Sequence, residues 1–318
     1  MEHDINLDGE TVAWERRAIE KLLLANVRER RAARRWRIVK SVLWMLLFAA
    51  LIWVLSLDML PSRTPGGPHT AVVSIRGEIA ERSESSAENV LPALRDALED
   101  SDSQALVLLI NSPGGSPVQA GLIYDEIRRL REKYDKPIYA VVEETCASAA
   151  YYIASATDRI YVDKASIVGS IGVLMDGFGF VGTLDKLGVE RRLLIAGENK
   201  GFLDPFTPVS PEQRRYAQDM LDQIHRQFIK AVKQGRGDRL KETPEIFSGL
   251  FWTGEQSIQL GLADDYGSLD SVARDVVKAE KLIDYTNKEN LAERVAKRFG
   301  AAIGAGAVKA LRAAPALR

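Results

Sequence analysis

The first residues that could do chemistry form a turn, Asn-Ser-Pro-Gly-Gly, at residues 111–115. This turn follows an almost wholly apolar segment, residues 105–110, which is typical of a strand buried in a parallel sheet. Paired glycines permit positive φ angles and a close approach of a substrate backbone. At the carboxyl end of such a strand, the N–H groups of Gly114 and Gly115 could form an anion site or an oxyanion hole. An ordinary tight turn before a helix is the alternative interpretation.

Ser148 is the candidate nucleophile. It stands between a predicted strand at residues 138–142 and a predicted helix, and small residues flank it on both sides. A serine on a sharp strand-to-helix turn exposes its hydroxyl, and the next backbone N–H, here that of Ala149, can stabilise an oxyanion. If this turn faces the glycine turn, the pair has the geometry that acyl transfer needs. A serine at a helix start is also a common N-cap, so the position alone does not identify a nucleophile.

A serine hydroxyl needs a base to remove its proton, and Lys200 is the candidate. Histidine is the usual base, but His69 lies in a predicted linker and His225 near the polar face of a predicted helix. A lysine can act instead where burial or a positive neighbour lowers its pKa from about 10.4 toward neutrality. Lys200 follows a predicted strand and stands between Gly197 and Gly201. A solvated surface lysine is the alternative interpretation.

Cysteine and histidine usage argues against a metal site. A single cysteine, Cys146, excludes an intramolecular disulfide and a thiolate zinc cage. The three histidines, His3, His69 and His225, have no metal-ligand spacing. Cys146 lacks an adjacent histidine, so we interpret it as a buried small residue and not as a nucleophile. We expect neither a metal nor another cofactor.

Alternating strands and helices must position these residues. Strand, helix, strand alternation implies right-handed crossovers, which predicts an α/β domain with a largely parallel sheet and covering helices. A long amphipathic helix at residues 211–234 is expected to cover the sheet or a neighbouring subunit. The predicted strands are residues 71–75, 105–110, 138–142, 159–162, 170–175 and 191–196, and the other predicted helices are residues 88–99, 118–134 and 147–156.

The N-terminal part of the chain predicts a membrane anchor. Residues 1–40 form a basic leader, in which residues 28–40 hold seven basic residues and one acid. The apolar residues 41–60 follow, and a helix of about 20 residues crosses a hydrocarbon core roughly 30 Å thick. The basic flank predicts a cytoplasmic leader and places everything after residue 60 outside the cytoplasm. A cleaved signal peptide is disfavoured by the long charged leader, and a buried core helix by the basic block.

Composition sets the remaining boundaries. Residues 61–69 form a linker rich in Pro and Gly, residues 70–283 form the folded domain, and residues 284–318 form a tail rich in Ala, Gly and Arg. The chain has 318 residues, of which 46% are hydrophobic and 27% charged, so it can bury a sizeable core. Its formal net charge is −1, and no basic stripe alternates with aromatic residues. We therefore expect no nucleic-acid partner.

Four segments, in this order along the chain, resemble the S49 serine peptidases, the family of signal peptide peptidase A, in its short form with one catalytic repeat. They are residues 110–116, 146–173, 196–214 and 252–270. The resemblance extends roughly from Ala71 to Val277. It implies a ClpP/crotonase-like fold, an N-terminal membrane helix and a Ser/Lys dyad in ring-shaped oligomers.

Matching the motifs makes Ser148 the nucleophile and Lys200 the general base. The N–H groups of Gly114 or Gly115 and of Ala149 would then form the oxyanion hole. The family usually has glycines directly after its nucleophile, whereas this chain has Ala149 and Ala150. Whether Ser148 and Lys200 meet within one chain or between neighbouring subunits is left open by the sequence.

The resemblance implies a serine endopeptidase in the inner (plasma) membrane, with its catalytic domain in the periplasm and a homo-oligomeric ring as its assembly. Its substrates would be extended, apolar polypeptides such as remnant signal peptides, with short Ala, Leu or Val side chains in a shallow groove. One alternative is a crotonase-like enzyme acting on acyl-CoA thioesters, although CoA is cytoplasmic and no site for its adenine diphosphate is evident. A catalytically silent membrane scaffold is the other alternative.

Overall fold

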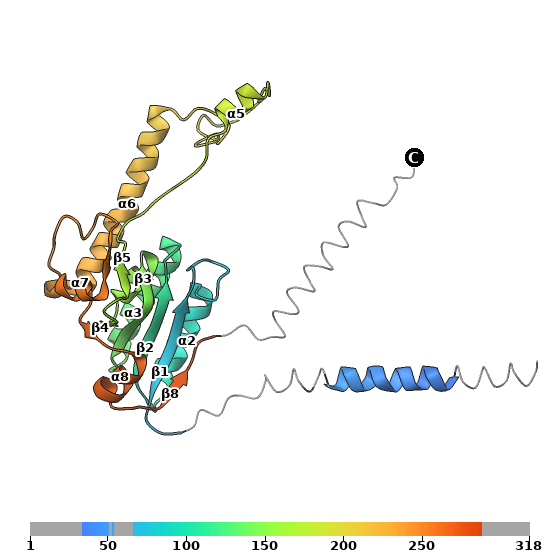
Figure 1. Ribbon diagram of the computed structural model, residues 1–318, viewed down its shortest axis with the longest axis vertical. Helices are drawn as coiled ribbons and strands as arrows, with labels where there is room; N and C mark the ends of the chain where they lie inside the picture. The colour runs from blue at the N-terminus through green and yellow to red at the C-terminus, as the bar shows by residue number, and fades with distance from the viewer. Residues whose placement is uncertain (1–33, 51–52, 54–65, 288–318) are drawn as a thin grey trace, which may run out of the picture. The chain divides into compact units, whose positions relative to one another are not determined.

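The computed structural model describes residues 34–50, residue 53 and residues 66–287. The chain divides into two units, Met1–Arg63 with Asn290–Arg318, and Thr64–Glu289. In the first unit residues 34–50 are helical, and within the described part of the chain no helix is both long and apolar enough to span a membrane. Residues 51–52 and 54–60 of the predicted anchor lie outside the described residues, as do residues 1–33 and 288–318 of the predicted leader and tail (Figure 1).

The second unit is built on one eight-stranded sheet (Figure 1). Its strands run in the order β6-β5-β3-β2-β1-β8, with β4 paired to β3 and β7 to β4. Only the β5–β6 pair is antiparallel among the described strands, so the prediction of a largely parallel α/β sheet is confirmed. The strands are β1 (His69–Arg76), β2 (Ser103–Ser112), β3 (Ile138–Ala147), β4 (Arg159–Val162), β5 (Ile167–Gly169), β6 (Phe251–Thr253), β7 (Asp265–Tyr266) and β8 (Leu282–Asp284).

Strand β2 lies inside the sheet, between β1 and β3, and is covered on both faces, which explains why its apolar residues do not alternate with polar ones. Leu106, Leu108 and Ile110 pack into the larger core on one face of the sheet. Val107 and Leu109 pack into a smaller core on the other face. Because helices cover both faces, the middle of the strand, residues 105–110, is apolar at every position.

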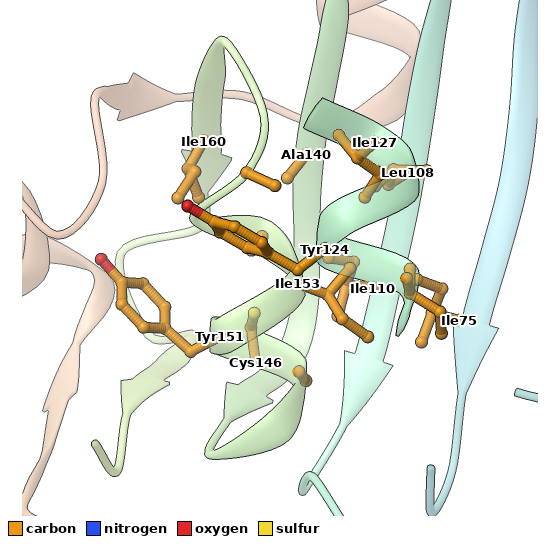
Figure 2. Close-up of a cluster of buried hydrophobic side chains, with 14 of the residues drawn as sticks. Ile75, Leu108, Ile110, Tyr124, Ile127, Ala140, Cys146, Tyr151, Ile153 and Ile160 are labelled. Atoms are coloured by element: carbon orange, nitrogen blue, oxygen red, sulfur yellow. The ribbon is translucent and has the colours of Figure 1, made fainter. Parts of the chain in front are cut away.

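Helices α2, α3 and α4 cover the larger core, whose centre is shown in Figure 2, and α8 and η2 cover the smaller one. Helix α3 begins at Pro117, and the Ser116 hydroxyl caps it by accepting from the Gln119 N–H at 3.4 Å. The helices are α2 (Ala87–Glu99), α3 (Pro117–Lys133), α4 (Ala149–Ala154), α5 (Val181–Lys186), α6 (Pro211–Arg236), the 3-10 turn η1 (Gly237–Arg239), α7 (Gly254–Gln259), α8 (Leu269–Ser271) and the π-helical turn η2 (Val272–Val277).

Strand β3 changes partner along its length. Residues 139–141 pair with β4, whereas residues 145–147 pair with β5. Ala147, the last residue of β3, lies opposite Gly169, the last residue of β5. The residue that follows, Ser148, is therefore placed at the carboxyl end of the parallel strands, the edge at which open α/β sheets bind ligands.

Two predicted strands are wrong. Residues 170–175 and 191–196 belong to no strand of the described chain. Strand β5 stops at Gly169 because Ser170 has a φ of 51°, which extended backbone does not allow. Residues 193–196 have apolar side chains, but residues 191–196 have no neighbouring strand in the described chain, and Leu194 is 96% exposed. A high β-propensity means that side chains suit a pleated sheet. It does not provide the neighbouring strand with which the segment would have to pair.

Residues 173–175 and 191–196 belong to a long connection between β5 and α6, residues 173–210, which we call the arm. It contains α5 and packs on itself, because the Phe180 N–H donates to the Pro205 carbonyl at 2.7 Å. It also packs on the first turns of α6, where Phe202 lies edge-on to Tyr216 with ring centroids 5.5 Å apart. Figure 1 shows α5 near the N-terminal end of α6, away from the sheet.

Candidate active site

The glycine turn and the serine turn lie against each other. A Cβ atom built on Gly114 would be 2.7 Å from the Cβ of Ser148 and 2.9 Å from the backbone nitrogen of Ala149. Gly114 also has a φ of 106°. Both the space and the backbone conformation require glycine at this position. Two turns that are more than 30 residues apart in sequence thus form one site at the edge of the sheet.

Ser148 has a strained backbone and an uncommitted hydroxyl. Its φ of 53° and ψ of −123° lie outside the regions that non-glycine residues ordinarily occupy. Its N–H donates to the Gly169 carbonyl at 2.8 Å, and its carbonyl accepts from the Tyr152 N–H at 3.0 Å. It occupies the N-cap position of α4, yet its side chain makes no capping bond and no hydrogen bond with any described residue. The N-cap alternative therefore does not account for this hydroxyl.

Two backbone donors are free beside this hydroxyl. The Gly114 N–H is already engaged, since it donates to the Ser112 hydroxyl at 3.1 Å. Its neighbour Gly115 is held by backbone contacts on both sides, because the Ile79 N–H donates to the Gly114 carbonyl at 2.9 Å and the Ser116 N–H to the Ile79 carbonyl at 2.8 Å. The N–H groups of Gly115 and Ala149 find no acceptor among the described residues. They are the donors available to an oxyanion at this site.

A cavity of about 480 Å³ opens beside Ser148, between α3, α4 and α6. Tyr152 lies at its side, stacked on Phe228 with ring centroids 4.9 Å apart and edge-on to Tyr124 at 5.2 Å. This volume is in the range of ligand-binding pockets. The lining residues are Gly115, Pro117, Val118, Gly121, Leu122, Asp125, Ser148, Ala149, Tyr152, Gly172, Val173, Ile224, Gln227 and Phe228.

Lys200 lies in the arm and is exposed. It does not line the cavity at Ser148. The arm contacts α6 at Tyr216, whereas the cavity begins on α6 at Ile224, about 12 Å further along the helix at a rise of about 1.5 Å per residue. Within the described part of one chain, Lys200 is therefore not placed at the cavity of Ser148.

The other ionisable candidates have structural surroundings. Cys146 is fully buried, and burial raises the pKa of its thiol, as expected for a small core residue. His69, predicted to lie in a linker, is instead the first residue of β1, where it is 1% exposed and contacts the Tyr285 hydroxyl at 3.1 Å. His225 is half-buried on α6, with its Nε2 3.0 Å from the Ile171 carbonyl. No three His, Cys, Asp or Glu side chains gather as a metal site within the described part of the chain.

Two serines at the site were missed from the sequence. Ser112 orients the glycine turn through the Gly114 N–H, and its place in the Asn-Ser-Pro-Gly-Gly motif could have revealed it. Ser170 follows Gly169, whose carbonyl holds the Ser148 N–H, and has a strained φ of 51°. No sequence signal points to Ser170, whose N–H donates to the carbonyl of a residue distant in sequence, Leu250, at 2.8 Å.

Comparisons with known proteins show which family the chain resembles. The profile of "Peptidase family S49" matches residues 131–283. A putative protease of Synechocystis is 31% identical over 208 residues, which cover 65% of this chain and 73% of that protein. A putative signal peptide peptidase SppA of Enterococcus faecium is 30% identical over 222 residues, covering 67% of this chain and 64% of that protein.

A further similarity concerns only part of a larger protein. The Na(+)/H(+) antiporter NhaA of Brucella abortus is 46% identical over 181 residues, which cover 57% of this chain but 25% of the antiporter. The chain therefore spans a quarter of the antiporter and less than two thirds of the Enterococcus faecium protein.

Proposed function

The chain belongs to peptidase family S49, and on that premise we propose that it is a serine endopeptidase with Ser148 as nucleophile and Lys200 as general base. The observation that supports this proposal most is the hydroxyl of Ser148. It is free of hydrogen bonds to the described residues, stands on a strained strand-to-helix turn, and lies at a cavity with two unengaged N–H donors. A nucleophile elbow has this arrangement.

In the proposed reaction, the Ser148 hydroxyl attacks the carbonyl carbon of a peptide bond. The neutral amine of Lys200 accepts the hydroxyl proton and then donates it to the leaving amine. The N–H groups of Gly115 and Ala149 stabilise the oxyanion. The role of Gly114 is steric, because its lack of a side chain lets the serine turn approach. Water then attacks the acyl-enzyme, with Lys200 again as base.

The dyad is proposed to form between neighbouring subunits of a homo-oligomeric ring. Support comes from the position of Lys200, which lies on the arm away from the Ser148 of its own chain. The arm also exposes apolar side chains, among them Leu174 at 81%, Phe178 at 79% and Leu194 at 96%. Large apolar side chains left exposed on one segment are typical of an interaction site, and a second copy of the chain is the partner in this proposal.

Mixing two inactive variants tests the nucleophile, the base and the subunit arrangement together. We expect Ser148→Ala and Lys200→Ala proteins to be folded and inactive when each is assembled alone. When the two are dissociated, mixed in equal amounts and reassembled, about a quarter of the sites should combine an intact serine with a neighbour's intact lysine. Hydrolysis of a fluorogenic apolar peptide measures the recovery.

The alternatives give different results in the same experiment. A dyad within one chain predicts no recovery on mixing, because every chain lacks one partner. Wild-type turnover in the separate Lys200→Ala protein would remove the lysine from the mechanism. Wild-type turnover in the separate Ser148→Ala protein would reject the serine mechanism itself.

Residues 41–60 are proposed to anchor the protein in the inner membrane, with the peptidase unit in the periplasm. The uncharged run at residues 42–57 and the basic residues before it support this orientation. Remnant signal peptides, and other exported or membrane polypeptides, are the proposed substrates. Alkaline extraction of membranes tests the anchor, and digestion of intact spheroplasts by added protease tests the orientation. Release of the protein by alkali would contradict the anchor. Protection of residues 66–287 from the protease would contradict the orientation.

A further inference from the structure

Asp125 stands out in the cavity beside Ser148, because the other described residues that line this cavity carry no formal charge. It lies on the same face of α3 as Val118 and Leu122, at helical spacings of three or four residues. These two apolar side chains are 69% and 49% exposed. The cavity thus has apolar walls and a single carboxylate.

The carboxylate of Asp125 is not committed to a structural contact. The next residue, Glu126, is bound by Arg95 at 2.6 Å and by Arg129 at 2.8 Å. Asp125 has no ion pair or hydrogen bond with any residue that the structure describes. Its charge nevertheless acts inside the cavity, because the pKa of Tyr152 is raised, first by burial and then by the negative charge of Asp125.

The position of Asp125 along α3 sets the length of a matching side chain. Gly115 and Pro117 border the cavity at the serine turn, and Asp125 borders it about 12 Å further along the helix, at a rise of about 1.5 Å per residue. A side chain that starts at the reactive carbonyl must be long to approach this carboxylate. Lysine and arginine combine a long methylene stem, which suits apolar walls, with a cationic head.

We propose that the cavity accepts a lysine or arginine side chain from the substrate residue immediately before the scissile bond, and that Asp125 is the residue that selects it. This inference rests on the proposed peptidase function, and at this one position it replaces the expected short apolar side chain with a cationic one. The methylene stem packs between Leu122 and Tyr152, and the head group pairs with the Asp125 carboxylate. A cationic side chain at the cavity leaves the carboxylate paired, whereas an apolar one leaves it solvated.

Two peptides separate charge selection from apolar fit. They are identical except for lysine or norleucine before the scissile bond, since norleucine keeps the stem and lacks the cation. The full-length protein is assayed in detergent as wild type, Asp125→Asn and Glu132→Gln. Glu132 is an exposed carboxylate on the same helix that does not line the cavity, so its variant controls for a general change of surface charge.

We expect the wild type to cleave the lysine peptide with the higher kcat/KM. Asp125→Asn should lower kcat/KM for the lysine peptide about tenfold and change that for the norleucine peptide less than about twofold. Glu132→Gln should leave both values and their ratio at the wild-type level. An equal loss on both peptides would instead indicate that Asp125 supports the fold of α3.

The possible failures are distinguishable. If the wild type cleaves both peptides and Asp125→Asn leaves their ratio unchanged, the selection by Asp125 is wrong and the peptidase function stands. A wild-type preference for norleucine has the same meaning, with an apolar residue as the occupant. If the wild type cleaves neither peptide nor an unrelated unfolded protein, the peptidase function fails and this inference fails with it.

Discussion

Ser148 carries strain that the surrounding residues must hold. A non-glycine residue in this region of φ and ψ costs on the order of 1–3 kcal/mol and persists only where its neighbours determine it. The Gly169 carbonyl fixes its N–H, and α4 fixes its carbonyl through the Tyr152 N–H. Gly114 fills the space next to its Cβ. The result is a hydroxyl presented to the cavity and not folded back as a helix cap.

Gly114→Ala tests how closely the two turns must approach. The added methyl would meet the Cβ of Ser148 at 2.7 Å and the Ala147 carbonyl oxygen at 2.8 Å, at a φ of 106° that alanine avoids. A flexible side chain could rotate away from the added methyl, but these atoms are part of the serine turn or directly attached to it. We therefore expect the whole turn to shift. The expected loss in kcat/KM on a fluorogenic peptide is at least about 100-fold, with a destabilisation of about 1–3 kcal/mol.

Gly66→Ala is the matched control, since a Cβ at Gly66 meets nothing within 4 Å and its φ is not positive. It should retain wild-type kcat/KM and stability. A Gly114→Ala protein with wild-type kcat/KM would show that the close approach of the two turns is not needed for activity.

At the scale of elements, α3 has two separate functions. Its inner side, with Ile123, Ile127 and Leu130, packs in the larger core. Its outer face borders the cavity at Ser148. Glu126, which is 8% exposed, links α3 to α2 by binding Arg95 of α2 and Arg129 of α3 itself. The helix that borders the cavity is therefore held to α2 by an ionic contact, between Glu126 and Arg95, that lies outside the cavity.

This contact predicts a pH dependence of stability. Hydrogen bonds from Arg129 and then from Arg95 outweigh burial and lower the pKa of Glu126 to about 2. A carboxyl whose pKa is depressed on folding stabilises the protein above its unfolded pKa of about 4.3, and this contribution is lost as pH falls toward about 2. Both arginines are about half exposed, so we expect a contribution on the order of 1–2 kcal/mol.

Urea unfolding of the peptidase unit at pH 7 and at pH 3 measures this effect. The wild type should lose more free energy of unfolding between the two pH values than Glu126→Gln does. Glu132→Gln, an exposed carboxylate on the same helix, should behave like the wild type. Equal losses in the wild type and Glu126→Gln would mean that the two arginines do not stabilise the ionised form.

Helix α6 connects the element scale to the whole molecule because its two ends differ. Near its C-terminal end Arg236, whose side chain is 0% exposed, binds both oxygens of Asp264 at 2.8 and 2.9 Å. Arg236 also donates to the Gly261 carbonyl at 2.9 Å. The N-terminal half of α6 is largely exposed and contacts the arm. One end of the helix is thus fixed to the sheet, and the other carries the arm.

At the scale of the whole molecule, the arm is one of the described parts whose large apolar side chains a single chain leaves exposed. Leu194 is 96% exposed, so its substitution should not disturb the fold of the chain. If the arm forms the proposed interface between subunits, Leu194→Asp should dissociate the proposed oligomer and lower kcat/KM at least about tenfold, because a charge in an apolar interface must be desolvated. Light scattering measures the mass, and circular dichroism checks that the fold is kept.

Thr183→Asp places the same charge at an exposed polar position of the same arm and should preserve both mass and activity. A Leu194→Asp protein with the mass and activity of the wild type would exclude this part of the arm from the interface.

Sequence reasoning worked where the signal was local. The apolar run of residues 105–110 and the helical spacing of residues 118–134 depend on neighbours a few positions away, and both elements are found. Residues 191–196 have a comparable apolar pattern and form no strand. A helix satisfies its own hydrogen bonds, whereas a strand needs a partner that its own sequence does not specify.

By itself, the sequence of this protein determined the largely parallel α/β fold and the two turns with their glycines and serine, because local pattern and backbone preference are enough to specify them. Only the tertiary structure decided that these turns touch, that Gly115 and not Gly114 keeps a free N–H, and that Lys200 lies away from Ser148 in one chain. It also placed Asp125 in the cavity. The physical reason is that contacts between residues far apart in sequence are set by how the elements pack, and no local pattern encodes that packing.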